Sequence, residues 1–481
     1  MKWLTFMLLL ACAPALAQTW TRAHGGPDNA GFANVVTDPI TVDSPRVAVP
    51  ALGIFAAGAG PVVDKNGTAY LGAINGQLIA IGADGTRLRT AQLPPDRRIF
   101  TSPIIASDGS IYVAASISID PTDHDHRQVR AWLYRFSPQL DQLWERPLPV
   151  RGQETGTAVA LNATGEGTAE IIAVAAVVKS PYTVNIAGFT PDGALLFSQD
   201  VGAANGLHSG NLSWLKILCW PFANACRGDD PVLVGHSPPD ALPSGIHSLP
   251  VGIAVSPGDV FVVTDGVNGI RGYHFSPGGL TKVFEKIDAR TLTSSAAVLP
   301  NHRSVYGVTD GRIAFSGPSN EHVADINQEP GPQGDLHHPI EAIPARLADG
   351  RIVSVNRFGS IEVINNVVPV GNLEASADTI AGVSASKHVF YLSTASRLLS
   401  FDADTLALLS TFPLTDGGQS SPAIGSNGRV YVLAGDTLTI FTVGKARPPT
   451  HIPDGPVVVS PELPQTPAIP PVPAIPLNPR N

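Results

Sequence analysis

A polar stretch near the start of the chain, SIDPTDHDHRQ at 118–128, carries the side chains with the clearest capacity for chemistry. Imidazole and carboxylate groups are the usual protein ligands of divalent metal ions. The spacing matches no strict metal motif, however, and the glycine that turns a calcium loop is absent. The stretch therefore predicts either a metal site or a solvated acidic loop. The candidate metal ligands are Asp120, Asp123, His124 and His126.

The first residues, MKWLTFMLLLACAPALAQ, contain a lysine, a short apolar core and the small-x-small sequence Ala15-Leu16-Ala17. This order is typical of a secretory signal peptide, here 1–17, and predicts a secreted or periplasmic protein. Leu9 to Cys12 also resembles a lipobox, so that a lipoprotein anchored at Cys12 is the alternative. No later stretch of eighteen or more apolar residues is present to span a bilayer.

Cleavage after Ala17 would leave two cysteines, Cys219 and Cys226. In an oxidising compartment, an even pair predicts a disulfide, and this one would close a short local loop. A metal site at the same place would need more thiols or imidazoles at zinc-finger spacing.

Composition and motifs exclude several classes of function. The net charge is −9 and there is no block of Lys and Arg, which argues against a nucleic-acid partner. There is no G-x-S-x-G nucleophile motif, P-loop or dinucleotide fingerprint. Only 15% of residues are charged, whereas there are 47 Gly and 44 Pro, a composition that favours many short strands joined by tight turns.

A repeat in the sequence predicts the fold that would position the candidate residues. TSPIIASDGSIYVAAS at 101–116 and SSPAIGSNGRVYVLAG at 420–435 share Ser-Pro, a turn with Asp-Gly or Asn-Gly, and an aromatic within a β-branched run. The aromatic or branched column recurs eight times, at Tyr70, Tyr112, Ile172, Phe261, Tyr306, Val353, Phe390 and Tyr431. Most intervals are about 40–45 residues, the period of a four-stranded propeller blade. The sequence thus predicts an all-β, eight-bladed β-propeller of antiparallel blades.

Each copy reads as strand, turn, strand, short turn and strand, with a fourth, outer strand in several copies. We expect two-residue hairpin turns with Gly67, Gly109, Gly350 and Gly428 at the positive φ. The last copy lacks an outer strand, so we expect an N-terminal strand within PRVAVPALG, 45–53, to close the last blade. The propeller would span 18–445, and the Pro-rich tail 446–481 would be disordered or polyproline-like.

The phrase S-P-x-small-x-x-[DN]-G-x-[VI]-Y-[VL], together with Trp144, resembles the pyrroloquinoline-quinone-type (PQQ-like) β-propeller repeat, and TWTRAHGGPDNAGF resembles the lead-in before its first blade. The resemblance covers about residues 20–445. The family includes quinone-dependent alcohol dehydrogenases and also cofactor-free scaffolds, such as the lipoprotein of the outer-membrane barrel-assembly machinery.

The resemblance implies specific demands for the dehydrogenase branch. Its members stack the quinone on an adjacent Cys-Cys disulfide, bind calcium through Glu, Asn and Asp, and sometimes carry a Cys-x-x-Cys-His haem domain. This sequence contains neither cysteine motif, and Leu, Phe or Val replaces the family's outer-strand Trp in most copies. We therefore expect the cofactor-free branch, with PQQ and calcium as the alternative.

In a propeller, the segments that lead into the inner strands lie on one face, together with the loops between second and third strands. We call this the upper face. Binding and catalytic residues of propellers lie mostly on such loops. These segments carry polar residues that predict either an anion, glycan or peptide site or a solvated rim. The candidate ligand-binding residues are Arg97, Arg98, Arg151, Glu154, Arg290, His337 and His338.

The step from Ile172 to Phe261 is about twice the others. It predicts either an inserted cap on the upper face, 203–246, that Cys219 and Cys226 would staple, or a degenerate ninth blade. We favour the cap, because the stretch has no Asn-Gly hairpin. Taken together, the residues predict an exported, non-catalytic binding or assembly scaffold with a protein, small polar or glycan partner. The alternatives are a quinone-dependent dehydrogenase and a carbohydrate-active propeller.

Overall fold

All residues that the computed structural model describes belong to one unit, Met1–Lys445; the second unit, Ala446–Asn481, lies wholly outside the described residues. The described residues are 20–56, 58–117, 130–149, 153–154, 160–162, 170–178, 183–203, 251–256, 260–265, 269–276, 279–287, 292, 294–308, 313–317, 342–355, 360–365, 368–374, 380–418 and 420–443. Within these ranges every regular element is a β-strand. The predicted tail therefore stays a prediction.

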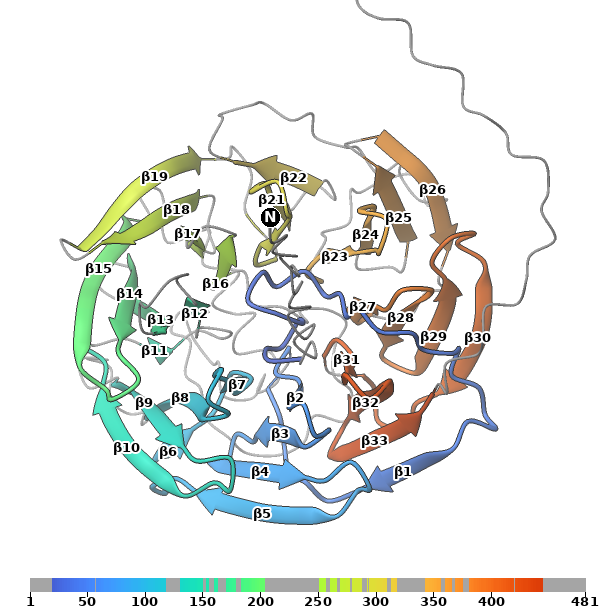
Figure 1. Cartoon of the computed structure of the whole chain (residues 1–481), viewed down its shortest axis with the longest axis horizontal. Helices are drawn as coiled ribbons and strands as arrows, with labels where there is room; N and C mark the ends of the chain where they lie inside the picture. The colour runs from blue at the N-terminus through green and yellow to red at the C-terminus, as the bar shows by residue number, and fades with distance from the viewer. Residues whose placement is uncertain are drawn as a thin grey trace, which may run out of the picture. The chain divides into compact units, whose positions relative to one another are not determined.

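Eight antiparallel sheets surround a central axis as the blades of a propeller (Figure 1). Within most blades the strands run in chain order from the axis outwards, whereas the last blade takes its outermost strand from the N-terminal part of the chain. The prediction of an all-β, eight-bladed β-propeller is confirmed.

The first four blades contain β2 to β19. Blade 1 consists of β2 (Val62–Val63), β3 (Ala69–Gly72), β4 (Gln77–Ile81) and β5 (Arg87–Gln92). Blade 2 consists of β6 (Arg97–Arg98), β7 (Ile104–Ile105), β8 (Ile111–Ile117), β9 (Ala131–Phe136) and β10 (Gln142–Pro147). Blade 3 consists of β11 (Gln153–Glu154), β12 (Ala160–Asn162), β13 (Ile171–Val178), β14 (Thr183–Phe189) and β15 (Leu195–Ala203). Blade 4 consists of β16 (Val251–Ser256), β17 (Val260–Asp265), β18 (Gly269–Ser276) and β19 (Gly279–Ile287).

The remaining blades contain β20 to β33 and the N-terminal strand. The described part of blade 5 consists of β20 (Ala297–Val298), β21 (Ser304–Gly307) and β22 (Ile313–Ser316). Blade 6 consists of β23 (Ala345–Arg346), β24 (Ile352–Val355), β25 (Ser360–Asn365) and β26 (Val368–Glu374). Blade 7 consists of β27 (Ile380–Ala385), β28 (Val389–Thr394), β29 (Arg397–Asp402) and β30 (Leu408–Pro413). Blade 8 consists of β31 (Ala423–Ile424), β32 (Arg429–Ala434), β33 (Thr437–Thr442) and β1 (Arg46–Val49).

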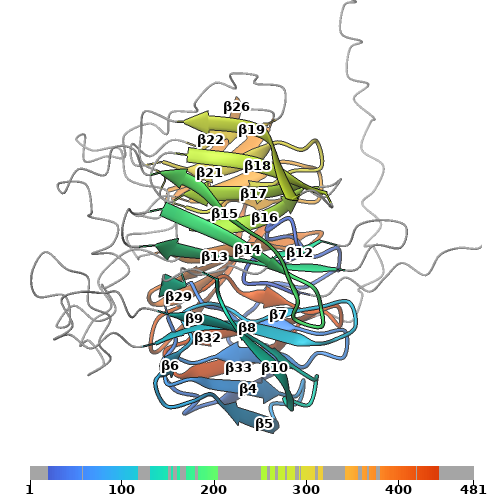
Figure 2. The ribbon, with the colours of Figure 1, turned by 90° about the vertical axis from the view of Figure 1, so that its left-hand side faces the viewer.

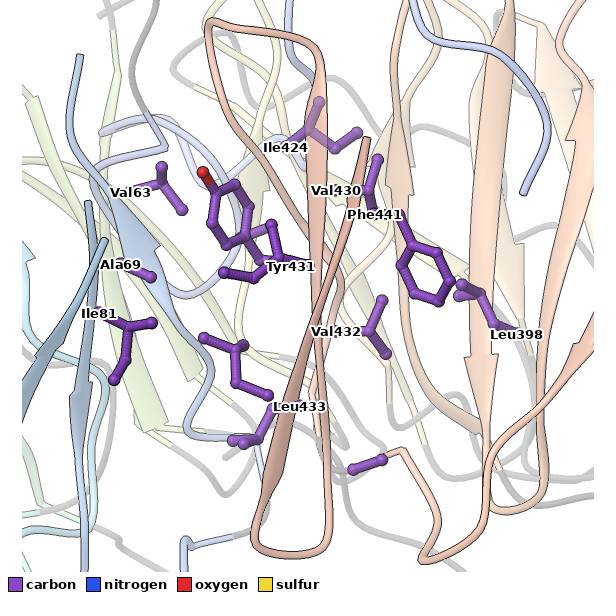
Figure 3. Close-up of a cluster of buried hydrophobic side chains, with 14 of the residues drawn as sticks. Val63, Ala69, Ile81, Leu398, Ile424, Val430, Tyr431, Val432, Leu433 and Phe441 are labelled. Atoms are coloured by element: carbon purple, nitrogen blue, oxygen red, sulfur yellow. The ribbon is translucent and has the colours of Figure 1, made fainter. Parts of the chain in front are cut away.

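The repeated aromatic or branched column forms the core between neighbouring blades. All eight of its members lie on the second strand of a blade and are at most 2% exposed. Because side chains alternate along a strand, one second strand contacts both of its neighbouring blades. In Figure 3, Tyr431 and Leu433 point toward Val63 and Ile81 of blade 1, while Val432 points toward blade 7.

The turns between first and second strands differ from the expected two-residue hairpin. In blade 1 the Gly67 N–H donates to the Asp64 carbonyl, and the Asp64 N–H donates to the Thr68 carbonyl, which leaves three residues in the turn. Of the Asn66-Gly67 pair, only Gly67 has a positive φ, 84°. This is a type I turn followed by a left-handed residue. The two-residue expectation was wrong, although the four predicted glycines all have positive φ.

Blades 3 and 4 are neighbours in the ring although the sequence between them is long. Ile172 on β13 and Phe261 on β17 belong to one hydrophobic cluster, and the two sheets follow one another in the side view of Figure 2. Apart from Ala203, which ends β15, the predicted cap at 203–246 lies outside the described residues. The cap and its disulfide Cys219–Cys226 stay predictions.

Candidate functional site

The N-terminal segment Trp20–Val35, here called the central segment, crosses the axis and binds the inner strands (Figure 1). An inner strand has an unpaired edge that faces the axis, and its backbone groups need hydrogen-bond partners. The central segment supplies partners in blades 1, 2, 4, 5, 6 and 7. The inner-strand residues bonded to it are Val63, Ile105, Val255, Val298, Arg346 and Ala385.

These bonds locate the central segment at the face opposite the upper face, here called the lower face. Each bonded residue is at or next to the last position of its inner strand, where the chain turns into the second strand. In blade 1, for example, Val63 ends β2, and its N–H donates to the Trp20 carbonyl over 2.7 Å. The sequence identified this segment only as a lead-in to the first blade.

Polar side chains of the central segment fill the lower end of the axis. Arg22 is 4% exposed, and its Nη1 donates to the carbonyls of Pro27 and Ile253 over 3.1 Å each. Asn29 is equally buried and donates from Nδ2 to the Ala296 carbonyl over 3.1 Å. Burial lowers the pKa of Arg22 to about 10, against the opposing attraction of Asp28. The segment therefore occupies the lower end with groups that bond to inner-strand backbone.

On the upper face, two of the segments leading into inner strands form short extra strands. Arg97 and Arg98, on β6, pair with Ile117 and Ser116 at the end of β8. In blade 3, Glu154 on β11 pairs with Ala176 of β13 in the same way. The structure thus brings Arg97, Arg98 and the backbone of Glu154 to the upper face. That they bind a ligand stays a prediction.

Arg97 is held by three neighbours. Its guanidinium lies 3.3 Å from the centroid of the Trp132 ring, and its Nε donates to the Tyr134 hydroxyl over 3.2 Å. Its Nη1 pairs with Asp96. Burial raises the pKa of Tyr134, and the hydrogen bond from Arg97 opposes that rise. The guanidinium is therefore fixed in place rather than extended into solvent.

The Arg98 side chain has different hydrogen-bond partners. Its Nη1 donates to the carbonyls of Pro95 over 2.8 Å and Arg97 over 3.2 Å. Both acceptors are neutral, so no described carboxylate within hydrogen-bonding distance compensates the charge of Arg98. Of the two predicted ligand-binding side chains that the structure describes, Arg98 is the one whose positive charge can attract an anionic partner directly.

The other predicted site residues lie outside the described residues. They are the ligand-binding candidates Arg151, Arg290, His337 and His338, the metal candidates Asp120, Asp123, His124 and His126, and both cysteines. The strands β8 and β9 do flank the acidic stretch, so it connects the second and third strands of blade 2 as expected. These residues remain sequence predictions.

Sequence reasoning missed a group of small hydroxyl residues at the upper starts of the inner strands. The Ser102 hydroxyl accepts the Gly60 N–H over 2.7 Å, which joins blade 2 to blade 1. A Cβ on Gly60 would lie 2.7 Å from the Ser420 hydroxyl of blade 8. The Ser-Pro pair that recurs in the repeat could have indicated these residues, and it marks the positions where inner strands approach closely near the axis.

The described residues include no cluster of ligands for the calcium of the alternative interpretation. Within the described ranges, no three His, Cys, Asp or Glu side chains lie close enough to hold a metal ion. Calcium needs six to eight oxygen ligands, whereas the described part of the predicted upper-face set contributes two arginines.

The fold and this geometry define the class, an eight-bladed β-propeller with a central N-terminal segment. No family model and no curated protein matches the sequence. Solved structures do match. The quinohemoprotein alcohol dehydrogenase from Comamonas testosteroni is 11% identical, covering 89% of this chain and 81% of its own, with a TM-score of 0.54.

Two further solved structures match. A europium-containing methanol dehydrogenase is 9% identical over 86% of this chain and 89% of its own, with a TM-score of 0.54. BamB from Moraxella catarrhalis is 13% identical over 82% of this chain and 85% of its own, with a TM-score of 0.43. At such identities the dehydrogenase matches establish the fold alone.

Proposed function

We propose that this chain is an exported, cofactor-free propeller that binds a partner through its upper face and catalyses no reaction. The observation that carries the proposal is the central segment, which occupies the lower end of the axis through bonds to six blades. A partner that binds at the axis would therefore have to do so from the upper face. The partner would be a protein or a small polar or glycan ligand.

The charge at Arg98 supports a role for this face. The side chain lies on the segment leading into blade 2, and among the described residues it donates to the carbonyl oxygens of Pro95 and Arg97. Surface charges of this kind act mainly on the rate of association and on specificity. In the described ranges, no helix is long and apolar enough to cross a bilayer.

The experiment compares two charge reversals on the full-length chain expressed in its own host. Arg98→Glu changes the upper face, and Arg303→Glu changes a lower-face turn of blade 5. Proteins and glycans captured by each variant are identified beside the wild type. Loss of one partner in Arg98→Glu alone supports the proposal. Retention of every partner in Arg98→Glu, or equal loss in both variants, contradicts it.

The second candidate is a quinone-dependent dehydrogenase, because two solved structures of the same fold, with TM-scores of 0.54, are dehydrogenases. An absorption spectrum and metal analysis of the purified chain, before and after addition of pyrroloquinoline quinone and calcium, separates the two functions. A bound chromophore with stoichiometric calcium and dye-linked alcohol oxidation would overturn the cofactor-free proposal. A colourless protein without turnover would remove the second candidate.

A further inference from the structure

A cavity of about 600 Å³ opens on the lower face, where blades 6 and 7 meet the central segment. Its volume lies in the range of small-molecule sites, roughly 300–1,000 Å³. The wall residues that matter here come from separate parts of the chain. They are Phe32, Arg346, Asp349, Lys387, His388 and Asp404.

Arg346 is the central cation of this cavity. Its guanidinium carbon lies 5.1 Å from the centroid of the Phe32 ring, and the side chain is half-buried. The described residues offer it no side-chain hydrogen bond or ion pair, and its Nε is buried without an acceptor. Asp28 attracts it at longer range, but Asp28 also acts on Arg22. The positive charge of Arg346 is thus incompletely compensated.

Neither of the two carboxylates in the wall forms an ion pair with Arg346. Asp349 pairs with Arg351 over 2.5 Å, and the same guanidinium donates to the Ala403 carbonyl. Asp404 is exposed and lies in the turn between the third and fourth strands of blade 7. Lys387 and His388 line the cavity from the turn between the first and second strands of blade 7, and Lys387 adds a second positive charge. An oxyanion between Arg346 and Lys387 would meet two donors of the kind that bind carboxylates.

We infer that this cavity binds the carboxylate of a ligand of amino-acid or short-peptide size. Arg346 and Lys387 bind the carboxylate, Phe32 contacts the apolar body, and Asp404 accepts from an ammonium or amide N–H. The negative charges of Asp349 and Asp404 disfavour multiply charged anions such as pyrophosphate. The site is on the opposite face from the one proposed above to bind the partner, so either assignment can fail without the other.

The test is calorimetric titration of the full chain with tri-alanine and with its C-terminal amide. We expect the acid to bind and the amide to bind at least about tenfold more weakly, because it lacks the charge-assisted hydrogen bonds. Arg346→Gln should weaken binding of the acid about tenfold or more. Arg303→Gln is the matched control, since Arg303 also lies 5.2 Å over a ring, that of Phe315, but does not line the cavity.

Two further measurements distinguish the possible results. Titration with L-alanine tells whether a free amino acid suffices or a peptide is required, and either result supports the inference. Lys387→Gln changes an exposed side chain and should fold normally, so a loss of about threefold or more is expected even if Arg346→Gln does not fold. Absence of tri-alanine binding at millimolar concentration, equal binding of the amide, or tighter binding of inorganic phosphate would each overturn the inference.

Discussion

Val47 of β1 lies opposite Ile440 of β33 in an antiparallel ladder, so the two ends of the ring are joined within one blade. The strand spans Arg46–Val49, inside the region 45–53 in which the sequence predicted it. The sheet it completes would otherwise end at β33 with exposed backbone groups.

Closure by β1 should depend on individual N–H groups. The Thr442 N–H donates to the Pro45 carbonyl, and alternation along an antiparallel pair then directs the Val47 N–H toward β33 and the Ala48 N–H toward solvent. We expect Val47→Pro to lower the free energy of unfolding about 1–2 kcal/mol more than Ala48→Pro. Urea denaturation measures both, and equal losses would show that the ladder does not close the ring.

The central segment should be sensitive to added volume at Gly31. This residue has φ +61°, and a Cβ there would lie 2.4 Å from His24 Cε1 and 2.9 Å from the Ala345 Cβ. Gly350 also has a positive φ, +92°, but its Cβ would meet nothing within 4 Å. We expect Gly31→Ala to cost about 1–3 kcal/mol more than Gly350→Ala, since only the former overpacks. Denaturation midpoints would measure this, and similar midpoints would refute docking of the segment at the axis.

His24 should make stability depend on pH. Its Nδ1 and Nε2 each lie 2.8 Å from a carbonyl oxygen, of Asn29 and Val383. Burial lowers the pKa of His24, and these two hydrogen bonds oppose that effect without cancelling it. The unfolded chain then binds a proton at higher pH than the folded chain does. Stability is therefore fully present above the unfolded pKa, about 6.5, and is lost as the pH falls below it.

The measurement is the free energy of unfolding of wild type and His24→Gln between pH 7.5 and 5. We expect the wild type to lose about 1 kcal/mol more than the variant over this range. Asp28, whose pKa burial raises, acts in the opposite sense, but it is present in both proteins and drops out of the difference. Parallel profiles would mean that His24 does not titrate differently on folding.

The stack of Arg97 on Trp132 should require a planar guanidinium. Arg97→Lys keeps the charge but loses the face-to-face contact and the geometry of the bond to Tyr134. We expect a loss of about 1 kcal/mol in unfolding free energy, against less than half of that for Arg98→Lys. Thermal denaturation measures both variants. An equal effect at the two positions would argue that Arg97 is an ordinary surface side chain.

The second strands were predictable because their signal is local. Tyr112 and Tyr431 lie within branched runs next to a turn, Tyr70 has the matching place in blade 1, and all three are buried on second strands as expected. The exact turn was less predictable, since Asn-Gly suits two- and three-residue connections alike. In blade 5 the sequence signal is absent: His302, with φ 63°, takes the place that glycine holds in blades 1, 2, 6 and 8.

For the candidate site, the sequence predicted the face of the propeller on which its residues lie but not their contacts. The repeat placed Arg97 and Arg98 ahead of an inner strand, and thus on the upper face, but their different partners depend on Trp132 and Pro95. The cavity beside Arg346 has no sequence signal, because its walls come from turns of two blades and from the central segment.

The class of fold, the eight blades and the N-terminal closing strand could be predicted from the residues, because alternation and turn residues act over a few positions. The position of Trp20–Val35 could not, since it follows from contacts in the folded chain. Its bonds join backbone groups to inner strands such as those ending at Val63 and Ala385, and backbone groups are identical in every residue. Their pairing therefore depends on the closed ring, which presents inner-strand edges from six blades at one axis.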